Sequence, residues 1–288
     1  MSIRVYIDGQ IREPETAVVS VFDRGFLFGD SVYETIALLN QRLIFLSEHL
    51  DRLERSASRI YLDLPPRAQV KRAIEETIAA AEEKDARIRV MVTRGVGGAD
   101  LDPASAISPR LIVIVQALGA PTADMLKTGV SVAVVKMSRG AATGVDPAVK
   151  SGNYLGSVLA IAEARRRLPG VNEAILCASS GSVAEGATSN IFVVDRGELA
   201  TPAIEVGILD GVTRGKVLEL ARGAGIVARE LPFLAPEGLR RADEVFLTSA
   251  VRGILPVVTV DGVKVGNGRP GPMTERLLSL YQLLTSEA

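Results

Sequence analysis

Lys150 is the residue whose type and setting most directly suggest chemistry. It stands in an irregular stretch just before an expected helix, with Ala148, Val149 and Gly152 as near neighbours. A lysine amine attacks a carbonyl carbon only when it is neutral, and an apolar or cationic setting favours the neutral form. Taken alone, the position fits a surface-loop lysine better, because most lysines lie in such places.

A second feature is a helix start that could bind an anion. Gly211, Val212 and Thr213 begin an expected helix, and a first helical turn offers unpaired N–H groups and the positive end of the helix dipole. Arg52, in the segment HLDRL, could add a guanidinium for bidentate phosphate contact. The alternatives are a tight turn without a ligand and a helix-surface arginine paired with a nearby carboxylate.

The counts of histidine and cysteine exclude several other chemistries. Cys177 is the single cysteine and His49 the single histidine, so an internal disulfide and a histidine metal cluster are impossible. The chain has no G-x-S-x-G turn for a serine hydrolase, and we expect no G-x-G-x-x-G after a strand. We expect Cys177 to be a buried strand residue and His49 to be a packed or capping residue.

Composition indicates an ordinary folded protein. The chain has 288 residues, 47% of them hydrophobic, a net charge of −1 and a pI near 6.0, enough for one large or two modest domains. This charge would not gather polyanions, and the apolar runs, such as 111–115, have only strand length. We also expect no cleavable leader. We expect no nucleic-acid partner, no membrane span, no metal and a cytoplasmic location.

Hydrophobic periodicity predicts the elements that must position these residues. In the first part of the chain we expect strands at 5–7, 18–21, 32–39, 87–93 and 111–117, with helices at 47–60 and 67–83. After residue 128 we expect strands at 130–136, 174–178, 191–194 and 226–230, an irregular loop at 138–150, and helices at 153–168, 213–224 and 272–284.

The order of these elements indicates an α+β fold with two domains. The stretch Gly119-Ala120-Pro121-Thr122 interrupts the pattern after a strong strand. We therefore expect a small N-terminal α/β domain at 1–118, a linker at 119–128 and a large C-terminal domain at 129–288. Cofactor sites favour the cleft between two domains.

Five separated segments, taken in order, resemble the class IV (fold type IV) aminotransferases, which use pyridoxal 5′-phosphate (PLP). They are EHLDRLERSA at 48–57, DPAVKSGNYLGSVLAIAEAR at 146–165, EGATSNIF at 185–192, GILDGVTRGKVLELA at 207–221 and DEVFLTSAVRGILPV at 243–257. The resemblance covers nearly the whole chain, from FDRGFLFGDSVYE at 22–34 onward. It implies a two-domain fold like that of D-amino-acid aminotransferase, whose larger domain is a pseudo-barrel that binds PLP.

The resemblance also implies a role for each matching residue. Lys150 would form the imine with PLP and then move the substrate Cα proton, as general base and general acid. Glu185 would face the pyridine nitrogen and keep it protonated, and Tyr154 would hydrogen-bond the phenolic O3′. A solvated turn acid at 185 and a core tyrosine at 154 are the alternatives. The other cofactor contacts would come from Arg52, Ser189, Asn190, Leu209, Gly211, Val212, Thr213, Ser249 and Ala250.

Within the class, the segment RIRVMVTRGVGGADLDP at 87–103 looks most like the short prokaryotic branched-chain aminotransferases. Arg89 matches the arginine found there at the substrate carboxylate or at a carboxylate-binding tyrosine. D-amino-acid aminotransferases carry Arg-x-His after TRG, where this chain has GADL at 98–101. Lyases of the aminodeoxychorismate type follow the lysine with H-x-N-R-L, where this chain has SGNYL at 151–155.

Two segments depart from the branched-chain pattern. GDSVYETI places Tyr33, an expected substrate contact, in a setting closer to the D-amino-acid branch. TSAVRG at 248–253 replaces the usual G-T-A-A-E and puts Arg252 where a glutamate is common. The backbone amides of Ala250 and Val251 could still bind a carboxylate or help to bind phosphate. Arg252 is then either a salt-bridged surface residue or a contact for an acidic substrate.

These observations predict a transaminase that exchanges an amino group between a branched-chain L-amino acid and 2-oxoglutarate. The alternatives are a D-amino-acid or (R)-amine transaminase, an aminodeoxychorismate lyase-type enzyme, and a cofactor-free binding protein on the same fold. The resemblance further implies a homodimer or higher homo-oligomer. In such an oligomer, Tyr33 and the loop at 97–101 would reach into the neighbouring subunit's site.

Overall fold

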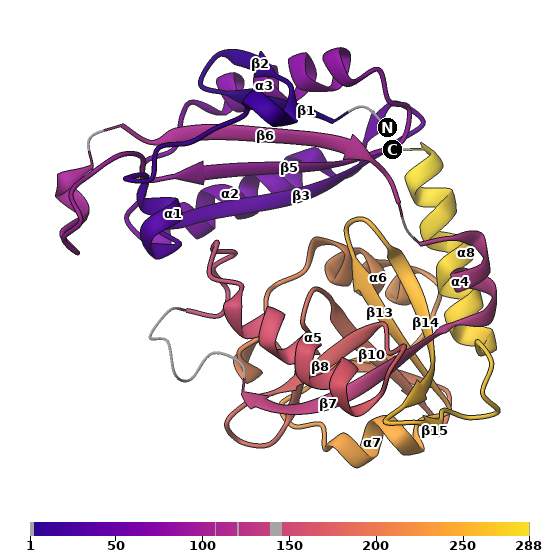
Figure 1. Ribbon diagram of the computed structural model, residues 1–288. Coiled ribbons are helices and arrows are strands. Elements are labelled where there is room, and N and C mark those ends of the chain that lie inside the picture. Colours follow the sequence, from indigo (N-terminus) through magenta and orange to yellow (C-terminus); the bar gives the residue numbers. More distant parts are fainter. Residues whose placement is uncertain (1–2, 107, 120, 139–145, 288) are drawn as a thin grey trace. The chain divides into compact units, whose positions relative to one another are not determined.

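The computed structural model describes residues 3–106, 108–119, 121–138 and 146–287, and the chain divides into two compact units (Figure 1). The first unit comprises Met1–Gly119 and Val149–Asn153, and the second comprises Ala120–Ala148 and Tyr154–Glu287. Lys150 therefore groups with the first unit, although the sequence placed it within 129–288. The physical reason is backbone pairing, because Ser151 forms an antiparallel bridge with Val32 and Gly152 N donates to Ser31 O.

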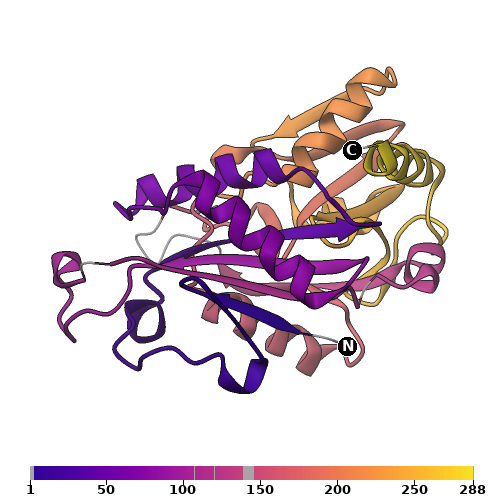
Figure 2. The same ribbon diagram turned by 90° about the horizontal axis from the view of Figure 1, so that it is seen from above.

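The first unit is built on an antiparallel sheet of six strands in the order β2-β1-β6-β5-β3-β4. Helices α2 (Leu46–Arg59) and α3 (Arg67–Ala81) cover one face of this sheet (Figure 2). The predicted helix periodicity is confirmed, since Leu50, Leu53 and Ala57 of α2 are buried. The strands are β1 (Arg4–Ile7), β2 (Gln10–Arg12), β3 (Ser31–Leu39), β4 (Arg42–Leu43), β5 (Ala86–Thr93) and β6 (Arg110–Ala117).

The strand predicted at 18–21 is wrong. These residues have no regular secondary structure apart from a turn beginning at Val21, and they pair with no strand. Val18 and Val21 are 72% and 62% exposed, so the apolar run has no sheet face against which to pack. The chain turns instead into the short helix α1 (Arg24–Phe28), whose first turn is capped by the Asp23 carboxylate accepting from Gly25 N.

The second unit is built on a sheet of nine strands. Eight follow the order β12-β11-β10-β13-β14-β7-β8-β9, β15 pairs with β14, and β9 also packs against β10 and β11, so the sheet curls on itself. The strands are β7 (Val130–Ser138), β8 (Glu173–Cys177), β9 (Val183–Gly186), β10 (Asn190–Asp195), β11 (Glu198–Pro202), β12 (Ala228–Leu231), β13 (Glu244–Ser249), β14 (Gly253–Val260) and β15 (Val263–Lys264). The predicted α+β fold with a curled, barrel-like sheet is confirmed.

The helices of this unit are α4 (Ala123–Thr128), α5 (Leu155–Arg167), α6 (Val212–Gly223), α7 (Pro236–Arg241) and α8 (Pro272–Glu287). Helix α5 packs on β7 and β8 through Ala160 and Ala164, and Phe192 stacks on Phe246 with ring centroids 4.9 Å apart. Helix α4 lies inside the range predicted as linker. Of the irregular loop predicted at 138–150, residues 139–145 lie outside the described residues.

Among the described helices, none is long and apolar enough to cross a membrane. The same part of the chain contains no group of three or more histidine, cysteine, aspartate or glutamate side chains that could hold a metal ion.

Candidate active site

Lys150 lies in a strand-like segment, and its backbone C=O and N–H groups both form hydrogen bonds. Its carbonyl accepts from Tyr33 N at 3.0 Å, and its N–H donates to Ser56 Oγ at 3.2 Å. Its Nζ donates to Tyr33 Oη at 3.4 Å and lies 4.5 Å from the centroid of the same ring. Lys150 is half-buried, and the amine is therefore presented by an ordered backbone rather than by a surface loop.

The ring of Tyr33 also contacts a second cation. The Arg89 guanidinium carbon lies 3.9 Å from the ring centroid, a cation–π distance. The contact follows from strand register, since Arg89 of β5 is opposite Thr35 of β3, which shares a sheet face with Tyr33. The structure thus brings Lys150, Tyr33 and Arg89 together in the first unit.

The expectation that Tyr33 reaches into a neighbouring subunit is wrong. Tyr33 is 4% exposed, and its hydroxyl and ring both contact Lys150 of the same chain. Strand β3 is a nine-residue strand paired with both β4 and β5, so the side chain is held inside its own unit.

Arg52 lies in a buried charge cluster that sequence reasoning missed. Its Nε and one terminal nitrogen each donate to a different Glu34 oxygen at 2.7 Å, and His49 Nδ1 lies 2.8 Å from Glu34 Oε2. All three residues are buried, so the alternative of a helix-surface Arg52 is wrong, while His49 is packed as expected. The signal available in the sequence was a carboxylate inside the apolar strand SVYETIALL.

Glu34 remains charged despite complete burial. Burial by itself would raise the pKa of its carboxyl group, but the charge and hydrogen bonds of Arg52, followed by those of His49, outweigh this effect and lower the pKa to about 2. The cluster fixes the direction of the Arg52 guanidinium, since both Glu34 oxygens hold it.

Glu185 lies at the centre of a second ordered cluster, in the second unit. It is 5% exposed on β9, so the alternative of a solvated turn acid is wrong. Its Oε2 accepts from Leu209 N at 3.0 Å and from Asn190 Nδ2 at 3.3 Å, and the same amide of Asn190 donates to Leu209 O at 2.9 Å. Glu185, Asn190 and Leu209, all predicted site residues, therefore lie together.

The start of helix α6 adjoins this cluster. A Cβ on Gly211, the N-cap residue, would lie 2.0 Å from Asn190 Oδ1, so any other residue would displace the Asn190 amide. Gly211 provides no capping side chain, and the first turn, with Val212 and Thr213, carries no acidic residue. Such a helix start suits an anion.

The buried hydroxyl groups of Ser189, just before β10, and of Thr248 on β13 make no hydrogen bond within the described part of the chain. Thr248 pairs with Asn190 in the sheet. A buried hydroxyl without a partner costs free energy. Together with the open start of α6, these donors fit an oxygen-rich ligand such as a phosphorylated pyridine.

Ser249 is the last residue of β13, and the turn that leads to β14 contains Ala250, Val251 and Arg252. Ser249 Oγ accepts from Arg252 N at 3.4 Å and from Arg252 Nε at 3.2 Å. Arg252 forms an ion pair with buried Glu173 at 2.7 Å, so it is salt-bridged, and its partner lies in the interior rather than on the surface.

Tyr154 and Cys177 occupy less enclosed positions. Tyr154 directly precedes α5 as its N-cap residue and is half-buried, so the alternative of a core tyrosine is wrong. Cys177 lies on β8 as predicted but is only partly buried. Burial, with Asp261 and Glu237 as smaller contributors, raises the pKa of its thiol, which disfavours a nucleophilic thiolate.

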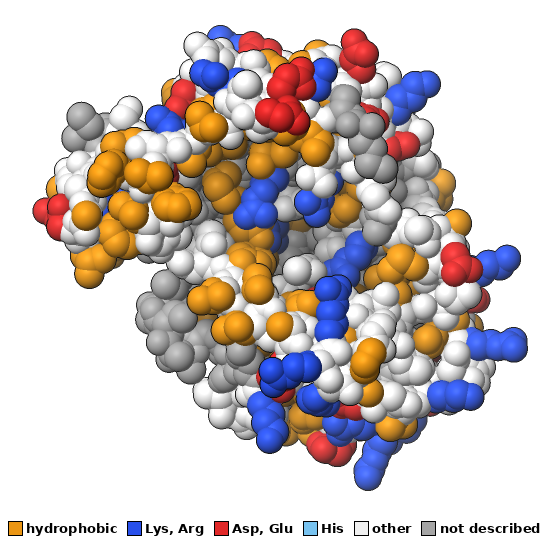
Figure 3. All heavy atoms as spheres, in the orientation of Figure 1, with side chains coloured by type: hydrophobic (Ala, Val, Ile, Leu, Met, Phe, Trp, Pro, Cys, Tyr) orange, Lys and Arg blue, Asp and Glu red, His pale blue; other side chains and the backbone are white. Residues whose placement is uncertain are grey.

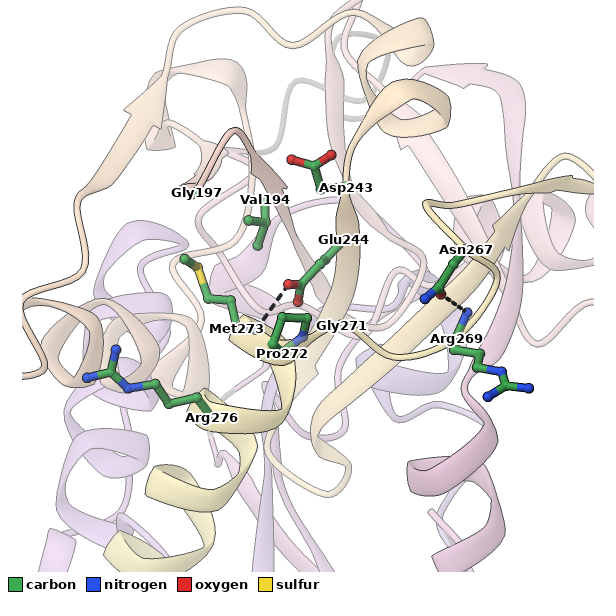
Figure 4. A pocket seen from close by; sticks show the side chains of 10 residues that line it. All are labelled: Val194, Gly197, Asp243, Glu244, Asn267, Arg269, Gly271, Pro272, Met273 and Arg276. Carbon is green, nitrogen blue, oxygen red and sulfur yellow. Dashed lines mark hydrogen bonds between the residues drawn. The ribbon is translucent and has the colours of Figure 1, made fainter.

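The expectation of no G-x-G-x-x-G after a strand is wrong, because GNGRPG at 266–271 follows β15 and precedes α8. This glycine-rich segment borders a surface pocket of about 540 Å³. The pocket is lined by Arg269 of the segment and by Arg276 of α8, among others (Figure 4). The segment does not belong to a parallel βαβ unit, since β15 has two residues and pairs antiparallel to β14. Glu244 already accepts from Met273 N and Thr274 N, the amides that a bound phosphate would need.

Comparison with known proteins identifies one matching family model, amino-transferase class IV, over residues 31–260. A protein of Methanocaldococcus jannaschii is 38% identical over 282 residues, with 97% of this chain and 96% of that protein covered; its name, a branched-chain-amino-acid aminotransferase, is itself provisional. The D-alanine aminotransferase of Bacillus licheniformis is 32% identical over 281 residues, with 97% and 96% covered. The branched-chain-amino-acid aminotransferase of Escherichia coli K12 is 34% identical over 297 residues, with 98% and 93% covered.

Solved structures agree with these relatives. A crystal structure of the Escherichia coli branched-chain amino acid aminotransferase matches with a TM-score of 0.92 at 32% identity, covering 100% of this chain and 96% of that one. A second crystal structure, of a branched-chain amino acid aminotransferase with pyridoxamine 5′-phosphate, also has a TM-score of 0.92, at 26% identity and the same coverage.

Proposed function

Because the chain belongs to the amino-transferase class IV family and is a transaminase, we propose that it uses PLP to exchange an amino group between a branched-chain L-amino acid and 2-oxoglutarate. The observation that carries the proposal is the ordered Lys150 amine beside Tyr33. Relatives and solved structures named as branched-chain aminotransferases support the substrate class. The neighbour solved with pyridoxamine 5′-phosphate supports the cofactor.

Lys150 Nζ would hold the aldehyde carbon of PLP and, once released by substrate, would take up and return the substrate Cα proton. Bound PLP supplies the electron sink that makes this proton removable. Tyr33 Oη, at 3.4 Å, would orient the amine. Tyr33 and Arg89 would also contact the substrate.

Glu185 would keep a proton on the pyridine nitrogen, which a nearby carboxylate favours. Its geometry supports this role, because Asn190 and Leu209 N hold the carboxylate in one orientation. Tyr154 would donate a hydrogen bond to O3′. Ser189 and the Leu209 side chain would contact the ring.

Arg52 and the α6 start, from Gly211 to Thr213, would bind the phosphate group. Glu34 would orient Arg52 by holding two of its guanidinium nitrogens. Ser249 and the amides of Ala250 and Val251 would complete the cofactor and substrate-carboxylate contacts at the β13–β14 turn. The unpartnered Thr248 hydroxyl supports a ligand near the same turn.

We also propose that the protein is a homodimer. Apolar side chains gather at the end of the first unit that carries α1 (Figure 3). Phe22, Phe26 and Leu101 are 54%, 68% and 79% exposed, and Gly97 N bonds Phe22 O, so the two segments adjoin. Exposed apolar patches of this kind mark interaction sites. A cytoplasmic location remains a prediction from sequence.

Reconstitution with PLP followed by single-substrate half-reactions tests the proposal. We expect visible cofactor absorbance that borohydride removes, leaving the cofactor covalently fixed to the protein. Without borohydride, L-leucine should convert this absorbance, but neither D-alanine nor aminodeoxychorismate should. Lys150→Ala should abolish the borohydride-fixable species, while Lys127→Ala, which removes an exposed lysine of α4, should leave it unchanged. A Lys150→Ala variant that still forms this species would refute the assignment, and conversion by D-alanine would shift the substrate to the D-amino-acid class.

A further inference from the structure

Arg252 lies at the meeting point of three segments of the second unit. One of its terminal nitrogens donates to Glu173 Oε2 at 2.7 Å and to Thr188 Oγ1 at 2.8 Å, while Thr188 Oγ1 donates to the same Glu173 oxygen at 2.8 Å. Arg252 Nε donates to Ser249 Oγ at 3.2 Å. One guanidinium thus connects the start of β8, the β9–β10 turn and the β13–β14 turn.

The burial of Glu173 makes this connection strong. Glu173 is 1% exposed, and within the described part of the chain its Oε1 makes no hydrogen bond. Its charge is therefore compensated through Oε2, by Arg252 and Thr188. A buried carboxylate that loses its cationic partner is costly, so the structure strongly resists the separation of Arg252 from Glu173.

The two connected turns carry residues assigned above to the cofactor. The β9–β10 turn leads from Glu185 through Thr188 to Ser189 and Asn190, and Gly186 N bonds Ser189 O at 2.7 Å across it. The β13–β14 turn begins at Ser249, whose hydroxyl Arg252 holds. The spacing between the ring-contacting turn and the phosphate- or carboxylate-contacting turn thus depends on Arg252.

We infer that Arg252 is a positioning residue. It acts through Glu173, Thr188 and Ser249 to hold the β9–β10 turn and the β13–β14 turn at a fixed distance from each other. Its Nε and one terminal nitrogen bind these groups, which fixes the direction of the guanidinium. The inference rests on the proposed PLP site. Displacement of a ligand-binding group by about 1 Å is sufficient to cost on the order of 100-fold in rate.

The test compares wild type, Arg252→Ala, Arg252→Lys and Thr188→Val. The apparent PLP dissociation constant is measured by titrating each apoprotein, KM and kcat are measured for L-leucine, and thermal unfolding is followed without cofactor. Arg229→Ala is the control, since Arg229 pairs with Glu198 on the surface. We expect Arg252→Ala to weaken PLP binding by roughly tenfold or more and to raise KM. Arg252→Lys keeps the charge but not the fork, so it should recover folding but only part of the affinity.

Thr188→Val removes one hydroxyl at nearly constant volume, so it should fold even if Arg252→Ala does not. We expect it to weaken PLP binding less than Arg252→Ala, and the double variant to be little worse than Arg252→Ala alone. If the variants lower thermal stability but leave the PLP dissociation constant and KM at the Arg229→Ala values, Arg252 is only structural and the inference is wrong. If wild type itself binds no PLP, the proposed function fails instead.

Discussion

At Glu34, burial raises the pKa of the carboxyl group and charge pairing lowers it, and the effect of charge pairing is the larger. The pKa falls from 4.5 to about 2, so on acidification the unfolded chain takes up this proton before the folded chain does. The resulting stabilisation is complete above about pH 5 and is lost as the pH falls through about 2. Its size is on the order of 3 kcal/mol, from about 1.4 kcal/mol per pKa unit.

We therefore expect Glu34→Gln to lower the free energy of unfolding by about 3 kcal/mol at neutral pH, since it leaves Arg52 buried without a carboxylate. Urea unfolding of both proteins from about pH 6 to about pH 2 should show this difference shrinking toward low pH. Glu237→Gln, at an exposed acid, is the control. A constant difference across this pH range would contradict the assignment of charge to Glu34.

The same cluster shows how far single residues can be predicted. Lys150, Glu185 and Arg52 were assigned roles from their motifs, because each motif is local in sequence, and these roles stay predictions. The partner of Arg52 was not, since Glu34 reaches it only when β3 packs against α2. Likewise, no local pattern shows that Thr188, Arg252 and Glu173 meet, since Glu173 of β8 and Arg252 are 79 residues apart.

The N-cap residue of helix α6 is a glycine, Gly211, because Asn190 occupies the space that a side chain would need. A Cβ at Gly211 would lie 2.0 Å from Asn190 Oδ1, whereas a Cβ at Gly215 of the same helix would meet nothing within 4 Å. We expect Gly211→Ala to displace Asn190, which holds both Glu185 and Leu209. It should weaken PLP binding and destabilise the fold by about 1–3 kcal/mol.

Gly215→Ala provides the matched control for that change. In a helix interior, alanine is favoured over glycine by roughly 0.5–1 kcal/mol, so this variant should be slightly more stable and should bind PLP like wild type. Titration of both apoproteins with PLP, together with thermal unfolding, separates the two effects. Equal PLP affinity for the two variants would show that Asn190 does not position the cofactor-binding groups.

Two of the strands that sequence reasoning missed have a common cause. Strands β13 and β14 are buried on both faces, so their sequences VFLTS and ILPVV lack the alternation that identifies a strand. Pro256 lies in β14 opposite Phe246, although proline has no N–H to donate to a neighbouring strand. Conversely, the run at 18–21 has strand composition but no strand beside it.

At the scale of the whole molecule, the apolar patch around α1 makes a specific prediction about assembly. We expect wild type to sediment as a dimer and Phe26→Asp to shift the equilibrium toward monomer, because Phe26 is 68% exposed within the patch and a buried unpaired carboxylate would oppose association. Phe233→Asp is the control, since Phe233 is 55% exposed but belongs to the second unit and not to this patch.

The measurement is sedimentation equilibrium over a range of protein concentrations, with circular dichroism to show that both variants fold. One terminal nitrogen of Arg24 donates to the Asp100 carbonyl, so α1 and the loop at 97–101 are held together, and loss of the dimer at α1 would also withdraw the loop from a neighbouring subunit. If that loop completes a neighbouring subunit's site, Phe26→Asp should lose transaminase activity in proportion to its loss of dimer. A fully active monomer would mean that the loop serves no neighbouring subunit and that each chain carries a complete site.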